Sequence, residues 1–552
     1  MRYFSVSDGC VGPDWLFDPL AAKRVENSSL DWYKIPDFNG NTDIKVIWEL
    51  SRFHWFLDLA LQSKRYFEES RELKIKLARY LVLDWLISNP PFKGPNWKCG
   101  QEASLRLINF LMALALEKTI FADAEFVDEF IAVHLKRIIL TLNYAKSQRN
   151  NHIISEAIAL MLGGSRLSES LNPRFARTGN AACNLGSAVL KTSLPKLVSK
   201  DGGFSQYSLN YHRLVLDLLT LLFLYSKNTK IVLEPSIMMI HSKLENWLSS
   251  LVVSGSRVAP RIGADDGSDM LWFLRQDPSD FLSSVELALY SRLEQSTIES
   301  LPLNFDEVIE LRQILPKTLQ ASEFLDRDWG VLCVRDSSFD VYLRGGCESF
   351  RIGQDDCGHV DIWYKGVCII GDQGSFSYAK NGDEEFCQAS RHNTVVIEGQ
   401  SQSLQVGRFL RIDGPRVNVL DSYRDLSGSV GLQILYSDRA SNFIDRRIKI
   451  AQNKIEIFDR ISSESESIEL NFWLGDSVLS VDKVSNSSSI ISFRSGIRVL
   501  CEVQGGTEIL RVDLADGIDR YLRKKQVFKI CILPSTNEVT TYFNVFDGEM
   551  NG

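Results

Sequence analysis

The spacing of hydrophobic residues changes once along the chain, near residue 318, and this change limits the possible folds more than any other feature. Before it, apolar side chains recur every three or four residues, as in Ile47, Leu50, Leu57 and Leu61, a spacing that is typical of amphipathic helices. After about residue 328 the chain breaks into short β-branched and aromatic runs such as FDVYLRGG and NKIEIFDRI, separated by Gly, Asp, Asn and Ser. We therefore expect a multidomain α + β protein, with a helical half followed by an all-β half.

The helical half contains roughly ten amphipathic segments joined by loops rich in Asn, Gly and Pro, which suits paired helices wound into an incomplete (α/α) toroid. An α-solenoid is the alternative, although the chain has no fixed repeat period. The second half predicts an antiparallel β-sandwich. We divide the 552 residues into an N-terminal extension that packs on the toroid (1–42), the toroid (43–318) and the β-sandwich (319–552).

Composition and charge exclude several classes of protein. A hydrophobic content of 44% and a charged content of 24% are typical of a globular chain. The net charge of -8 argues against broad binding to nucleic acid or anionic membrane, and no apolar run is long enough to predict a membrane span. The ten cysteines are scattered without a CxxC pair, so we expect buried, reduced thiols.

The first residues, MRYFSVSDGCVGPDW, show no basic stretch followed by an apolar core. This predicts a cytoplasmic protein, or a periplasmic or secreted one if a signal peptide has been removed. The sequence does not indicate an oligomeric state.

Three segments of the helical half carry candidate site residues. In NPPFKGPNWKCGQEASLRLINF, Trp97 offers a flat face for a sugar ring and Arg106 a planar fork for a carboxylate or sulfate. Glu102 lies four residues before Arg106, so the two side chains could instead pair with each other.

SQRNNHIISEAIALML places Asn151 and His152 at the start of a helix, where they form either a helix cap or a polar pocket. DGGFSQYSLNYHRLVLDLL contains Tyr207 and Tyr211 one helical turn apart.

The densest polar cluster lies in the β half, in CGHVDIWYKGVCIIGDQGSFSY and SRHNTVV. Side chains that alternate along a strand share one face of a sheet, so His359 and Asp361 are expected on the same side. A His and Asp set of this kind suits zinc or another divalent cation, whereas turn residues and salt bridges are the simpler interpretation. The cluster comprises His359, Asp361, Asp372, Arg391, His392 and Asn393.

Taken in order, these segments resemble the heparinase II/III family: WELSR, NPP with GPNW and QEASLR, NNHIISEA, DGGF with YH, GHVD, GDQG and RHNTVV. The resemblance extends by motif from about residue 43 to 410. It implies a lyase that cleaves a uronic-acid-containing acidic polysaccharide by β-elimination. The polymer could be like a glycosaminoglycan, like alginate or a bacterial exopolysaccharide.

The resemblance also implies roles for individual residues. Asn151 and His152 would neutralise the substrate carboxylate, while Tyr211 and His359 would transfer protons. A structural divalent metal, zinc first, with calcium or manganese as alternatives, would be held by Asp361, Asp372 and His392. Some relatives carry a second histidine where this chain has Asp361. The remaining residues, expected to bind substrate, are Trp97, Glu102, Arg106, Tyr207, Arg391 and Asn393.

Two other functions remain open from the sequence. A glycoside hydrolase on the same toroid would need two carboxylates across a cleft, and Glu102 and Glu156 are the first candidates. A glycan-binding protein of polysaccharide assembly would use Trp97 and basic residues as a sugar platform without turnover.

Overall fold

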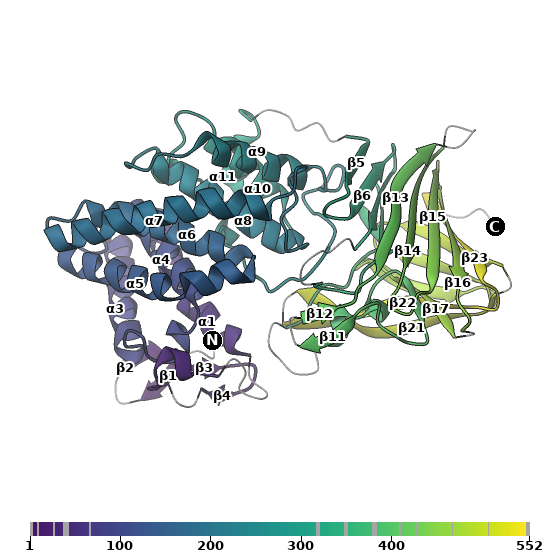
Figure 1. Cartoon of the computed structure of the whole chain (residues 1–552), viewed down its shortest axis with the longest axis horizontal. Coiled ribbons are helices and arrows are strands. Elements are labelled where there is room, and N and C mark those ends of the chain that lie inside the picture. Colours follow the sequence, from purple (N-terminus) through teal and green to yellow (C-terminus); the bar gives the residue numbers. More distant parts are fainter. Residues whose placement is uncertain are drawn as a thin grey trace.

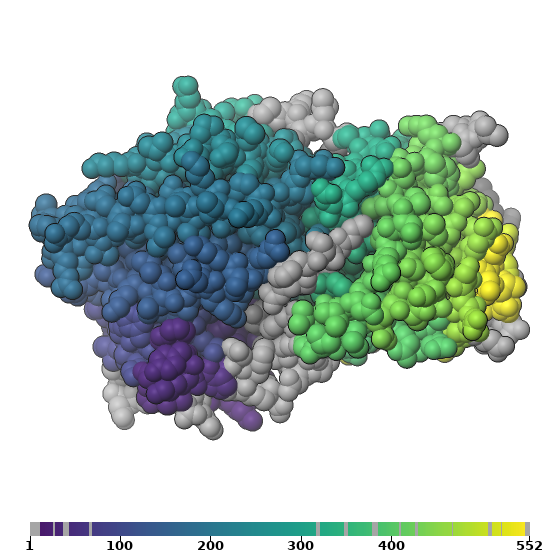
Figure 2. All heavy atoms as spheres, in the orientation of Figure 1, coloured from purple at the N-terminus to yellow at the C-terminus, as the bar shows by residue number. Residues whose placement is uncertain are grey.

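The structure is a computed structural model. It describes residues 4–7, 10–25, 28–36, 43–65, 68–315, 321–346, 352–377, 384–407, 410–424, 429–465, 467–505, 507–520 and 522–547. A helical half and a β half lie side by side (Figure 1). The space-filling view shows the two halves side by side (Figure 2).

The helical half is the expected incomplete (α/α) toroid. Three of its helices, α4, α6 and α8, are buried on nearly all faces and pack against one another as an inner layer. The outer helices α5 and α7 bury one stripe each and cover the inner layer. The helices are α1 (Ile44–Ser51), α2 (His54–Arg65), α3 (Glu68–Ser88), α4 (Gly100–Leu116), α5 (Ala124–Gln148), α6 (Asn151–Ser168), α7 (Pro173–Leu197), α8 (Leu209–Ser226), α9 (Pro235–Ser249), α10 (Leu282–Ser291) and α11 (Phe305–Leu311).

The β half consists of antiparallel sheets that share one core, so the expected β-sandwich is confirmed. Ile448 and Ile457 of the eight-stranded sheet belong to the same buried cluster as Leu470 and Ile530 of the four-stranded sheet. Burial alternates along β15 and β16, as the two-residue period of a half-buried strand requires.

The eight-stranded sheet has the order β13 (Arg416–Arg424), β14 (Val430–Ser437), β15 (Phe443–Ala451), β16 (Lys454–Ser462), β23 (Glu538–Asp547), β20 (Ile497–Gln504), β19 (Ser488–Phe493) and β18 (Val478–Lys483). The four-stranded sheet has the order β10 (Val395–Ile397), β17 (Ile468–Trp473), β22 (Arg523–Pro534) and β21 (Thr507–Arg520). The five-stranded sheet runs β5 (Glu323–Asp326), β6 (Val331–Arg335), β7 (Phe339–Arg344), β8 (Val360–Tyr364) and β9 (Val367–Ile370).

Among the described residues, three two-stranded sheets complete the fold: β1 (Phe4–Ser7) with β2 (Cys10–Pro13), β3 (Phe17–Asp18) with β4 (Lys23–Arg24), and β11 (Leu404–Gly407) with β12 (Leu410–Ile412). The first two lie in the N-terminal extension. The expected domain limits at 42 and 318 fall outside the described residues. The nearest described elements are α1, which begins at Ile44, α11, which ends at Leu311, and β5, which begins at Glu323. Within the part of the chain that the structure describes, no helix is long and apolar enough to cross a membrane.

Candidate functional site

The N-termini of the three inner helices meet at one place. Asn151, the first residue of α6, donates its side-chain amide to Oε1 of Gln101 in the first turn of α4, over 3.0 Å. Its backbone N–H donates to Oε1 of Gln206, in the loop before α8, over 2.8 Å. Helix N-termini carry partial positive charge and favour anions, so this junction suits a carboxylate. The two glutamines were not singled out from sequence, because each acquires its role only through contacts 50 or 55 residues away.

Asn150, rather than Asn151, caps α6: its Oδ1 accepts the backbone N–H of His152 over 3.1 Å. The Asn151 side chain is therefore not consumed by capping. It is buried, whereas the His152 side chain is half-buried. The two neighbouring residues thus lie at the same helix end with different access to solvent.

The two candidate tyrosines have different surroundings. Tyr211 lies in the first turn of α8, which Ser208 caps, and its side chain is half-buried. Tyr207 is almost fully buried in the left-handed conformation (φ 52°), with its ring 6.0 Å from Trp329 and 5.8 Å from the Arg344 guanidinium. Of the two, Tyr211 is more accessible to a ligand.

The Tyr207 contacts link the helical site to the β half. Arg344 ends β7 and donates its backbone N–H to the carbonyl of His359 over 2.9 Å. Its guanidinium also holds the carbonyls of Trp329 and Gly330. The loop that carries Gln206 and Tyr207 therefore packs near the segment that carries His359.

Trp97 and Arg106 do not lie in a cleft. Trp97 is 0% exposed and has no face available for a sugar ring. Arg106 is equally buried, 5.2 Å from the Trp97 ring, and donates to Nε2 of His134 and to two backbone carbonyls. The expected sugar platform is thus corrected to a packed, hydrogen-bonded part of the toroid core.

Glu102 does not pair with Arg106. Both of its carboxylate oxygens accept hydrogen bonds from Arg52 of the WELSR segment, at 2.6 and 2.7 Å, and the pair is buried. Glu156 is also buried, and its Oε2 has no hydrogen-bond partner. Neither carboxyl group is presented to a cleft as a hydrolase would require.

In the β half, His359 lies immediately before β8 and is buried. Its Nδ1 accepts the backbone N–H of Asn393 over 2.8 Å. A backbone N–H can only donate, so the proton of the neutral ring is on Nε2, which lies 3.2 Å from Oδ2 of Asp361 and 3.8 Å from Oδ2 of Asp372. Burial disfavours the charged ring, but Asp361 and Asp372 outweigh it and raise the pKa of His359 above its ordinary value.

The group of side chains that could hold a metal differs from the predicted ligand set in one position. Ligand atoms of His359, Asp372 and His392 all lie within 4.8 Å of one another, whereas the sequence predicted Asp361 in place of His359. Asp361 lies beside this group and accepts the backbone N–H of Asp372 over 2.9 Å. His392 bonds Asp372 through Nδ1 at 2.8 Å, and its buried Nε2 has no partner. Two imidazoles and a carboxylate with an unpaired buried nitrogen fit a divalent metal.

Arg391 and Asn393 are engaged within the protein. Asn393 is fully buried and joins the carbonyl of Val360 to the backbone N–H of Trp473. Arg391 donates to the Asp516 carbonyl over 2.8 Å and pairs with Glu385 at 3.0 Å. Asn393 therefore supports the His359 segment rather than facing a ligand.

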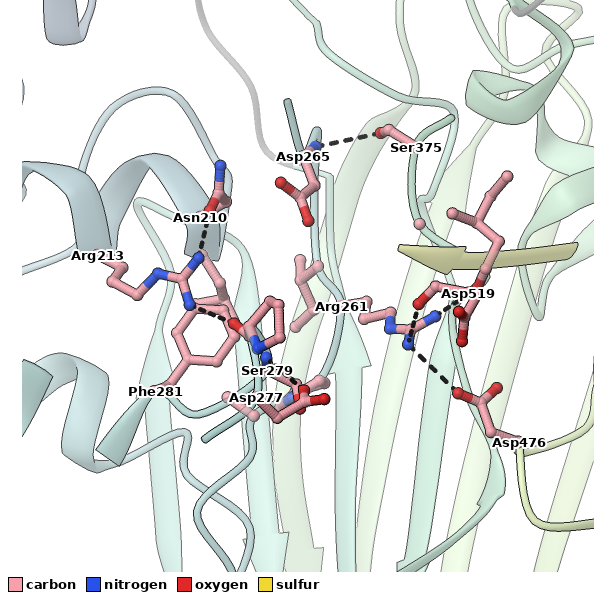
Figure 3. Close-up of a pocket in the computed structure, with 18 of the residues that line it drawn as sticks. Asn210, Arg213, Arg261, Asp265, Asp277, Ser279, Phe281, Ser375, Asp476 and Asp519 are labelled. Atoms are coloured by element: carbon pink, nitrogen blue, oxygen red, sulfur yellow. Dashed lines mark hydrogen bonds and ion pairs between the residues drawn. The ribbon is translucent and has the colours of Figure 1, made fainter. Parts of the chain in front are cut away.

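A cavity of about 420 Å³ lies between the two halves (Figure 3). Arg213 and Phe281 line it from the helical half, and Ser375 and Asp519 from the β half. Arg213 is two residues, about 200° of helix rotation, from Tyr211, so it lies on the opposite face of α8. None of the residues expected to form the site lines this cavity.

Two residues that line the cavity, Arg261 and Asp265, join the two halves. Arg261 donates to the carbonyls of Ile518 and Asp519 at 2.7 and 3.0 Å, and the Asp265 backbone N–H donates to Oγ of Ser375 at 3.2 Å (Figure 3). These contacts hold the β half against the segment between α9 and α10.

Each half of the chain matches its own family model. The family model described as Heparinase II/III N-terminus matches residues 14–236, and the model described as Heparinase II/III-like, C-terminal, matches residues 327–545. No curated protein matches the chain.

Solved structures share the fold across nearly the whole chain. A structure of heparinase III aligns with a TM-score of 0.66 at 14% identity, covering 97% of this chain and 83% of that chain. A mutant of the heparan sulfate lyase HepC from Pedobacter heparinus gives 0.60 at 16%, covering 96% and 81%. The chondroitin AC lyase of Streptomyces coelicolor A3 gives 0.57 at 12%, covering 91% and 74%.

The two matching family models, together with the toroid and β-sandwich that the chain shares with solved heparinases and chondroitin lyases, identify it as a polysaccharide lyase. The chain belongs to the heparinase II/III family, as the sequence motifs predicted. Neither the hydrolase nor the non-catalytic alternative gains support from the fold or from the positions of Glu102, Glu156 and Trp97.

Proposed function

We propose that the protein cleaves a uronate-containing polysaccharide by β-elimination at the junction of the inner helix N-termini. The observation that carries this proposal is the pair of hydrogen bonds at Asn151, whose side-chain amide donates to Gln101 and whose backbone N–H donates to Gln206, where α4, α6 and the start of α8 converge. Elimination needs such a donor, because the C5 proton of a uronate becomes acidic only when the charge of its carboxylate is neutralised.

The carboxylate would be held by Asn151 and His152. One hydrogen of the Asn151 amide is used by Gln101, and the other can donate to the substrate. The partial positive charge of the helix N-termini strengthens this binding in a partly buried site. The bond to Gln101 orients the side-chain amide in advance, and the bond from the backbone N–H to Gln206 fixes the start of α6, so little reorganisation accompanies the growth of charge in the transition state.

Tyr211 and His359 would then transfer the protons. Because the Nδ1 of His359 accepts the Asn393 N–H and its proton is on Nε2, His359 would protonate the departing O4 and Tyr211 would take the C5 proton. Tyr211 comes from the first turn of the inner helix α8, and His359 directly precedes β8 of the five-stranded sheet, so a sugar chain would lie between the two halves.

His359 has two competing roles, and its hydrogen bonds favour proton transfer. A metal bound at Nε2 while Nδ1 accepts the Asn393 N–H would leave no proton on the ring. We therefore propose that Asp372 and His392 hold a divalent metal, zinc, with Asp361 beside them, and that His359 keeps its Nε2 proton. The metal would stiffen the β half and would not act on the sugar.

The substrate we propose first is a glycosaminoglycan, because a heparan sulfate lyase and a chondroitin AC lyase share the fold. Alginate-like and bacterial exopolysaccharide substrates are second. The test is to incubate the full chain with heparan sulfate, chondroitin sulfate, alginate and an exopolysaccharide, and to follow ultraviolet absorbance and reducing ends together. Reducing ends that grow with absorbance support elimination; reducing ends without absorbance contradict it.

A further inference from the structure

Helix α3 is apolar on two opposite faces. Its inner face, formed by Ile75, Ala78, Val82 and Trp85, is buried in the toroid core. The other face carries five large exposed side chains: Leu73 (68% exposed), Leu77 (44%), Tyr80 (41%), Leu83 (47%) and Ile87 (79%). At 100° per residue these five fall within an arc of about 120°, so they form one stripe, which we call the α3 stripe; Lys76 and Asp84 also fall within this arc. An exposed, largely apolar stripe of this kind is typical of an interaction surface.

The spacing of the α3 stripe is symmetric about its middle residue. Leu73 and Ile87 are equally far from Tyr80 along the chain, and so are Leu77 and Leu83. A two-fold axis beside Tyr80, perpendicular to the helix, would therefore place Leu73 of one molecule opposite Ile87 of another. The stripe is self-complementary under such a rotation, as an isologous interface requires.

The charged residues within the stripe obey the same symmetry. Lys76 precedes Tyr80 by four residues and Asp84 follows it by four. The rotation would place Lys76 at the same height along the helix pair as Asp84 of the second copy, so that opposite charges attract each other across the interface. The Asp84 carboxylate is held in place by a 2.7 Å hydrogen bond from the Trp15 indole, and Lys76 is largely exposed in its ion pair with Glu72. A parallel arrangement would instead bring Lys76 level with its own counterpart, which is unfavourable.

We propose that α3 pairs in antiparallel fashion with α3 of a second copy of this chain, and that the protein is a two-fold symmetric dimer. Figure 1 shows α3 on the side of the toroid remote from the β half, so dimerisation leaves the boundary between the halves unobstructed. A 21-residue helix is about 30 Å long, and one helix from each partner covers less than a standard interface. The dimer should therefore dissociate on the order of micromolar concentration.

Sedimentation velocity of the full chain tests the proposal when the protein concentration is varied from about 0.1 to 100 times the expected micromolar dissociation constant. We expect dimers that Leu73→Lys and Ile87→Glu each convert to monomers, while an equal mixture of the two variants recovers a heterodimer, because the antiparallel register brings the new charges together. The matched control is Leu171→Lys, at a fully exposed leucine of the helical half that lies outside α3, which should leave the dimer intact.

Three results would overturn the proposal. The first is a monomer at the highest concentration, and the second is a dimer that neither α3 variant weakens. The third is a monomer that binds anionic lipid vesicles through the same leucines, which would assign the α3 stripe to a membrane surface. Circular dichroism of each variant establishes that it is folded, and lyase activity should be unchanged in both α3 variants because α3 is remote from the proposed site.

Discussion

The backbone N–H of Asn393 donates to Nδ1 of His359 over 2.8 Å, and this single bond determines where the imidazole proton lies. Asn393 is itself fixed by the carbonyl of Val360 and the backbone N–H of Trp473, so the donor cannot easily turn away. The proton is consequently on Nε2, where Asp361 and Asp372 stabilise it. His359 is thus prepared to exchange a proton at one defined atom.

His359→Ala should reduce kcat by about a hundredfold to ten-thousandfold, the usual contribution of a positioned proton-transfer group. KM should change little, because the proton moves only in the transition state. Bound metal should stay at the wild-type level, since the ring is proposed not to be a ligand. Elemental analysis and steady-state kinetics of the same preparation measure both quantities. Loss of metal to the extent seen in His392→Ala would show instead that His359 is a ligand.

Asp372→Asn and His392→Ala should each lose the divalent metal and lower the melting temperature by several degrees, because metal binding adds to the free energy of folding. A chelator should lower the wild-type melting temperature to a similar value. Asp482→Asn, at an exposed aspartate in the same half, is the control and should bind metal normally. A wild-type protein without stoichiometric metal, unaffected by chelator, would disprove the metal site.

Tyr211→Phe should lower kcat by about a hundredfold or more while leaving folding and glycan binding intact, because it removes one hydroxyl and keeps the ring. The control is Tyr207→Phe, whose ring is packed between Trp329 and Arg344 and whose activity should stay within a few-fold of wild type. Single-turnover absorbance assays distinguish the two. The reverse pattern would transfer the catalytic role to Tyr207.

The order of elements and the family could be predicted from the sequence, because the hydrophobic period and the motif order are properties of consecutive residues. The burial of Trp97 and Arg106 could not be predicted, because Arg106 lies on α4, an inner helix whose polar residues also face protein, and Trp97 directly precedes that helix. Nothing near Glu102 indicates that its partner is Arg52, which lies 50 residues earlier. The grouping of His359 with His392 depends on sheet packing between segments 33 residues apart, which local patterns do not specify.

The raised pKa of Glu156 predicts how the stability of the protein depends on pH, and this dependence tests whether the carboxyl group is structural or catalytic. Burial raises its pKa to about 8, with His152 opposing the shift, and Oε2 has no hydrogen-bond partner. The folded protein therefore keeps a proton that the unfolded chain releases near its ordinary pKa of 4.5. This contribution to stability is fully present below pH 4.5 and is lost as the pH rises through about 8.

Glu156→Gln, which imitates the protonated carboxyl, should remove this dependence. Between pH 5 and 8 the wild type should lose stability relative to the variant by up to about 1.4 kcal/mol for each pH unit. Urea unfolding at several pH values measures the difference, and parallel curves for the two proteins would contradict the raised pKa. The variant should retain lyase activity at neutral pH, because the side chain is buried beneath the site and takes no proton from the sugar. A folded but inactive Glu156→Gln protein would instead favour a carboxylate-based hydrolase.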